Sequence, residues 1–72
     1  MFSDVDFDWA LRLVREKMDV DGVTQSDVAR MAGISRQRVS LLMRGKSKSR
    51  RTLRMIVRAL HMEKEVRAPS IY

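Results

Sequence analysis

Apolar residues recur along this chain at intervals of three and four positions, a spacing that places them on one face of an α-helix. Near the start, the spacing predicts a first helix with a buried face formed by Phe7, Leu11, Val14 and Met18. Ser3 and Asp6 have the separation of a capping box and are expected to open this helix. Near the end, a last helix is expected from about Ser49 or Thr52 to His61, with a buried face formed by Leu53, Ile56, Val57 and Leu60.

Two shorter helices are predicted between these. The sequence Thr24-Gln25-Ser26-Asp27 is a second capping box, so a helix is expected from Gln25 to about Ala32. Gly33 can adopt the positive φ that ends a helix and turns the chain sharply. Ser35 is then expected to cap a third helix, which Gly45 ends in the same way. The expected internal contacts of this pair are Val28, Ala29, Val39 and Leu42.

After the last helix the pattern is ambiguous. Residues 63–67 could add one helical turn before Pro69 stops it, and residues 68–72 are a candidate flexible tail. The prediction is one compact all-α domain over residues 1–72, with four or five helices. Packing inside this domain is the expected role of Met18, Met31, Met43, Met55 and Met62.

Charge is distributed unevenly along the chain. The 72 residues carry a net charge of +6, yet residues 1–21 hold six acids and three bases. Residues 22–60 hold ten bases and one acid, Asp27. Because a solvated surface normally mixes both signs, this segment favours binding to a polyanion, with nucleic acid preferred over an anionic membrane surface. A basic face that only promotes solubility is the remaining alternative.

Other residue types argue against several classes of function. The chain has no cysteine and one histidine, His61, so neither a disulfide nor a metal cluster is expected. No nucleophile has a neighbouring base, and no run of 18 apolar residues occurs, so neither an enzyme nor a membrane protein is predicted. The start does not read as a secretory signal, and a cytoplasmic location is expected. No cofactor or small-molecule ligand is expected, because the small core is needed to hold the helices together.

Residues 24–46 have the form of a helix-turn-helix, two short helices joined by a turn that contains glycine. This stretch closely resembles the phage repressor and Cro-type (XRE-like) family of DNA-binding domains. The specific features are the Thr-Gln start, Ala29, the Gly-Ile-Ser turn and the closing Arg-Gly-Lys. The weaker resemblance extends from about Phe7 to Leu60, and it implies a lambda-repressor-like fold.

The resemblance implies that the helix beginning near Ser35 enters the major groove of DNA. The base-reading residues would then be Arg36, Gln37, Arg38, Ser40 and Leu41. Arginine can bond guanine O6 and N7, and glutamine can bond adenine N6 and N7. Leu41 stands where many relatives carry a polar residue, so it would contact either a thymine methyl or a protein partner. The implied phosphate-binding residues are Gln25, Ser35, Arg44, Lys46, Lys48 and Arg51, of which Arg51 could enter a narrow minor groove.

Two functions are consistent with this sequence. The first is a Cro-like or repressor-like transcriptional regulator of phage origin, which binds an operator in double-stranded DNA as a homodimer. The second is a small modulator, antirepressor or antitoxin-like protein that binds a partner regulator instead. The surface for such a partner would include Trp9, Leu13, Leu41, Met43, Ile71 and Tyr72. The pattern alone leaves Trp9 and Leu13 open between core and partner surface.

Overall fold

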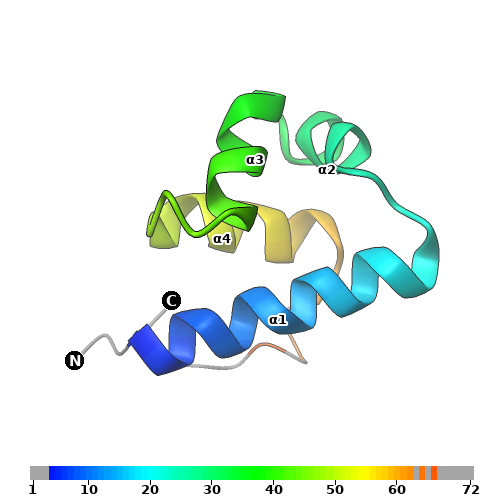
Figure 1. Ribbon diagram of the computed structural model, residues 1–72. Coiled ribbons are helices and arrows are strands. Elements are labelled where there is room, and N and C mark those ends of the chain that lie inside the picture. The colour runs from blue at the N-terminus through cyan, green and yellow to red at the C-terminus, as the bar shows by residue number, and fades with distance from the viewer. Residues whose placement is uncertain (1–3, 63, 65, 67–72) are drawn as a thin grey trace.

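The computed structural model describes residues 4–62, 64 and 66, and it contains four helices and no strand within that part of the chain. In order they are α1 (Asp4–Asp21), α2 (Gln25–Ala32), α3 (Arg36–Met43) and α4 (Arg50–Ala59). Figure 1 shows α4 between α1 on one side and the α2–α3 pair on the other, and α4 contacts all three. The all-α prediction is confirmed.

The polar residues predicted to begin α2 and α3 do so. The Asp27 N–H donates to Thr24 Oγ1, and the Thr24 N–H donates to Asp27 Oδ2, both at 3.1 Å. Ser35 caps α3 by accepting from the Arg38 N–H at 3.2 Å. For α4 the structure decides between the two predicted starts in favour of Ser49 as the cap. The predicted cap of α1, Ser3, lies outside the described residues.

Helices α2 and α4 end in the same kind of backbone turn, in which the residue that ends the turn has a positive φ. Gly33 follows α2 with a φ of +70°, and the Ile34 N–H donates back to the carbonyl of Ala29 at 3.0 Å. The same left-handed turn follows α4, but there the residue is His61, with a φ of +56°. The prediction that the last helix extends to His61 is therefore two residues too long, since the chain leaves the helix after Ala59.

One core joins all four helices, and its fully buried members include Phe7, Val14, Val28, Val39, Leu42, Leu53, Ile56 and Val57. The chain after α4 adds to this core, because Met62 and Val66 are also buried. That contribution was not predicted. The expectation that all five methionines fill the core is wrong for Met31, which is 51% exposed on α2. Met55 is half-buried and is not part of the core cluster, so the expectation holds for Met18, Met43 and Met62. The candidate tail, residues 68–72, lies outside the described residues.

Candidate nucleic-acid interface

The α2–α3 pair is held together by a small apolar contact surface. Val28 and Ala29 on α2 and Val39 and Leu42 on α3 are all buried. Because a small side chain such as Ala29 allows close approach, α3 can cross α2 directly after the turn at Gly33. The inner face of α3 is therefore fixed against the core, and its outer face is left toward solvent at the edge of the molecule (Figure 1).

The outer face of α3 carries the predicted base-reading residues. Arg36, Gln37, Arg38 and Leu41 are exposed, and Ser40 is half-buried. Leu41 exposes 38% of its surface. Met43, which is expected from the sequence to lie with Leu41 on a partner surface, instead belongs to the core and is 5% exposed. The five predicted base-reading residues therefore lie on one helix. Met43 is no longer a candidate for the partner surface.

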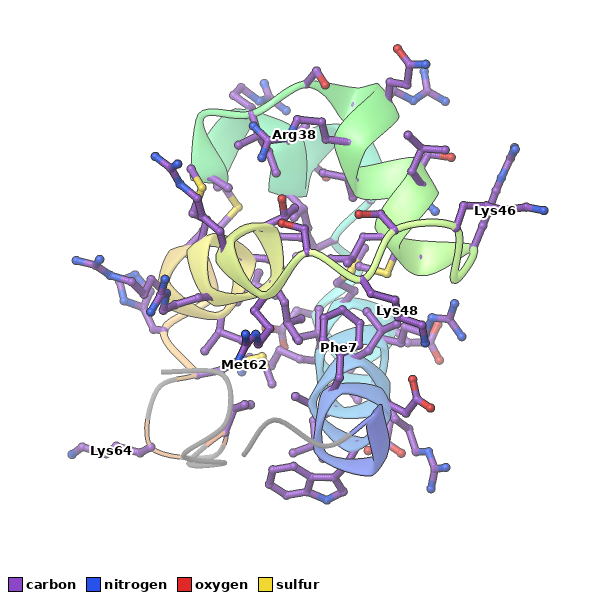
Figure 2. All side chains as sticks on the ribbon, turned by 90° about the vertical axis from the view of Figure 1, so that its left-hand side faces the viewer. Phe7, Arg38, Lys46, Lys48, Met62 and Lys64 are labelled. Carbon is purple, nitrogen blue, oxygen red and sulfur yellow. The ribbon has the colours of Figure 1, made fainter. Side chains whose placement is uncertain are left out.

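Arg38 differs from its neighbours because its guanidinium has a partner within the protein. Its Nη2 donates to Oγ1 of Thr52 at 2.9 Å, and Thr52 is 2% exposed at the start of α4. In Figure 2, Arg38 lies above α4 at the side of the α2–α3 pair. A guanidinium has five N–H donors, so this bond leaves others available while it restricts the orientation of the group. Sequence reasoning did not identify Thr52, which is 14 positions away.

Most of the predicted phosphate-binding residues lie on exposed loop and helix-end positions. Arg44, Lys46 and Arg51 are exposed and form no ion pair with any residue that the structure describes. Lys46 projects from the loop between α3 and α4, away from the body of the molecule (Figure 2). Gln25 is half-buried as the first residue of α2. The hydroxyl of Ser35 is already used as the cap of α3.

Lys48 is held by α1. Its Nζ lies 3.2 Å from Asp8 Oδ1 and 5.4 Å from the centre of the Phe7 ring. Figure 2 shows Lys48 and Phe7 next to each other where the loop meets α1. An exposed ion pair of this kind contributes only about 0–1 kcal/mol, so a phosphate could still compete with Asp8 for the ammonium group. The contact connects the basic loop to α1, which the sequence did not indicate.

The single acid of residues 22–60 is already used within α2. Asp27 accepts from the Thr24 backbone N–H and pairs with Arg30 at 2.6 Å. The backbone hydrogen bond from Thr24 lowers the pKa of the Asp27 carboxyl most, followed by the Thr24 hydroxyl; the nearby Arg30 lowers it further. Asp27 is therefore a capping residue, and its carboxylate contacts Thr24 and Arg30 at α2 rather than the side chains of α3. The outer face of α3 stays positive.

Within residues 4–62, 64 and 66, no three acidic or histidine side chains lie close enough together to hold a metal ion. None of the four described helices is both long and apolar enough to cross a membrane.

Comparison with known proteins gives one result. A family model described as helix-turn-helix matches residues 11–66, a span that begins within α1 and includes α2, α3 and α4. No curated protein and no solved structure matches the chain. The matched span covers well over half of the chain and includes every candidate base-reading and phosphate-binding residue.

Proposed function

We propose that this chain, which belongs to the phage repressor and Cro-type helix-turn-helix family, represses transcription by occupying an operator in double-stranded DNA. The observation that carries the proposal is the outer face of α3. Arg36 and Gln37 stand exposed at its start, the opposite face is anchored in the core, and α3 contains no acid. Long hydrogen-bond donors on an anchored helix suit the edges of bases in the major groove.

In the proposed complex, Arg36 and Gln37 read base edges and Arg38 does so from an orientation set by Thr52. Ser40 and Leu41 contact bases farther along the groove, with Leu41 suited to a thymine methyl group. The phosphates are held by Gln25, Arg44, Lys46, Lys48 and Arg51, which lie on loops and near helix ends. The Ser35 hydroxyl caps α3, so a phosphate contact there would have to share it with the Arg38 N–H.

One recognition helix reads only a few base pairs, so we propose a homodimer on two half-sites about 34 Å apart. Two copies related by a two-fold axis would bind a palindromic operator and exclude RNA polymerase from an overlapping promoter. A partner regulator is not needed for this activity.

The experiment selects bound duplexes from a random pool and then measures the affinity of two variants for each single-base change in the selected site. Arg36→Ala should lose about 1–3 kcal/mol at one base pair of each half-site and become indifferent to that base. Lys46→Ala is the matched control, because it removes one cation from a loop and should weaken all sequences equally. If the two variants have the same profile across the site, the base-reading role of Arg36 is wrong.

A second candidate function is supported by exposed apolar side chains. Trp9 exposes 42% of its surface on α1, and Leu41 exposes 38% on α3. A small modulator could use either residue to bind a second regulator. Leu13 contributes less than expected because it packs partly against the core, and Ile71 and Tyr72 lie outside the described residues. This candidate predicts that the purified protein retards no duplex until a second protein is added.

A further inference from the structure

A groove lies between the second half of α1, the start of α2 and the end of α3. Its volume is about 840 Å³, which is within the range of small-molecule sites. Figure 1 shows how the space arises, because α4 lies between α1 and the α2–α3 pair and contacts both. The sequence argument against a small-molecule ligand applies to a buried pocket, which would take side chains from the core. This groove is open to solvent and forms without that loss.

The floor of the groove is apolar. Met18 of α1 and Met43 of α3 line it, and they are almost fully buried, with exposures of 8% and 5%. Val23, which is half-buried in the turn between α1 and α2, lines it as well. A methionine side chain is unbranched and flexible, so this floor can adjust to an apolar group that is placed on it. The groove therefore suits a ligand with an apolar body.

The charged side chains that line the groove are of both signs. Arg15 and Arg44 are cationic and Glu16 and Asp19 are anionic, so the lining has no net charge. All four are exposed, and none forms an ion pair within the part of the chain that the structure describes. An anion is repelled by the two acids, and a cation is repelled by the two arginines. A ligand that carries one charge of each sign avoids both repulsions.

The two signs are separated along α1. Arg15 and Arg44 also line a smaller hollow next to Gly45, which places both cations at that end of the groove. Asp19 lies one helical turn beyond Arg15, about 6 Å farther along α1 in the direction of Gly22. The free ends of an extended dipeptide are about 7 Å apart, because each residue spans about 3.3–3.6 Å. A dipeptide therefore has the spacing of charges that the groove requires.

We infer that this groove binds a short peptide that has apolar side chains and free ends. Its carboxylate lies between Arg15 and Arg44, and its ammonium group faces Asp19. Its side chains rest on Met18 and Met43.

The effect of such a peptide on DNA follows from shared residues. Arg44 and Gln25 line the groove, and both are proposed phosphate contacts. A peptide in the groove therefore competes with DNA and acts as an inducer. This part of the inference rests on the proposed function, whereas the binding of the peptide does not.

The test titrates the full chain, without DNA, with the dipeptide Leu-Leu and follows the backbone amide signals by NMR. Saturable shifts are expected at Val23 and at the other residues that line the groove. The matched ligand control is N-acetyl-Leu-Leu-amide, which keeps both side chains and has no charge. It should bind about tenfold more weakly, because two exposed charge pairs are lost and each contributes a few-fold in affinity.

Two variants test the assignment of the charges. Asp19→Asn should weaken Leu-Leu about three- to fivefold and leave N-acetyl-Leu-Leu, which has no ammonium group, unchanged. Arg15→Gln should weaken Leu-Leu to the same extent and leave Leu-Leu-amide, which has no carboxylate, unchanged. Lys17→Ala is the matched control, since it removes a charge from α1 outside the groove and should alter none of these affinities. Thermal unfolding checks that each variant is folded.

A second arm measures the affinity of the parent chain for its selected duplex with saturating Leu-Leu. The affinity should fall at least about tenfold, because the peptide occupies residues that the phosphates need, and N-acetyl-Leu-Leu-amide at the same concentration should have no effect.

The outcomes of the two arms separate the alternatives. If Leu-Leu gives no saturable shifts, or if N-acetyl-Leu-Leu-amide binds equally well, the inference is overturned while the proposed function stands. Saturable binding of Leu-Leu that leaves the DNA affinity unchanged overturns the competition with DNA. A parent chain that binds no duplex in the absence of peptide contradicts the proposed function, and the titration without DNA still decides whether the groove binds the peptide.

Discussion

At the scale of single residues, the contact between Arg38 and Thr52 has the most direct bearing on specificity. The family resemblance implies that Arg38 is a base reader, and no acid lies near it in the sequence. The structure places the buried hydroxyl of Thr52 at 2.9 Å from its guanidinium. No local pattern reveals this, because the two residues lie on different helices and meet only through packing of α3 against α4.

Thr52→Val should remove the acceptor while keeping the shape of the buried side chain. We expect the free energy of unfolding to change by at most about 1.5 kcal/mol, because one hydrogen bond is lost and no buried hydroxyl is left behind. Operator specificity should fall at the base pair that Arg38 reads, with an unchanged salt slope. In the background of Arg38→Ala, the same substitution should have no further effect on DNA binding. An equal loss in both backgrounds would show that Thr52 acts without Arg38.

The second residue-scale prediction concerns the pH dependence of the α2 cap. Because the pKa of Asp27 is lowered in the folded state, its contribution to stability is present above the unfolded pKa of about 4 and is lost as pH falls through the lower folded value. Thermal unfolding of the parent and Asp27→Asn should therefore differ at neutral pH and converge in strongly acidic buffer. A difference that stays constant down to the most acidic buffer would contradict this account of the cap.

At the scale of the elements, helix starts could be predicted better than the last helix end. Thr24 and Ser35 are polar caps whose geometry depends on nearby residues, and Gly33 is favoured where φ is positive. The end of α4 could not be predicted, because histidine is a much weaker signal of a left-handed position than glycine. That turn directs the following chain back toward the core, where Met62 and Val66 are buried. The position of the turn therefore depends on long-range packing, which the local sequence pattern does not show.

His61→Gly should therefore stabilise the domain. A residue with a Cβ is disfavoured at a φ of +56°, and glycine relieves this cost but has more freedom when unfolded, leaving a net gain of about 0.5–1 kcal/mol. The imidazole is exposed, so little packing is lost. His61→Ala is the control, since it removes the ring and keeps the Cβ. Urea unfolding at constant pH measures both, and an equal gain from alanine would assign the effect to the ring instead.

At the scale of the whole molecule, the sequence predicts an all-α domain, and it predicts where the helix-turn-helix lies. It does not predict how charge is arranged in space. A sum along the chain assigns residues 1–21 an excess of acid, yet the fold turns Arg12 and Arg15 of that segment toward Arg44. Helical periodicity predicts which side of α1 is apolar. It does not predict which element lies next to the polar side, because that depends on how α1 packs against α4.

The most direct test of the central claim, that the outer face of α3 lies in the major groove, is protection of guanine N7 from methylation on the selected duplex, since N7 faces that groove. We predict protected guanines in two half-sites about 34 Å apart, with protection lost at one position per half-site in Arg36→Ala. Full methylation of those guanines in the bound complex, or an unchanged pattern in Arg36→Ala, would contradict the account.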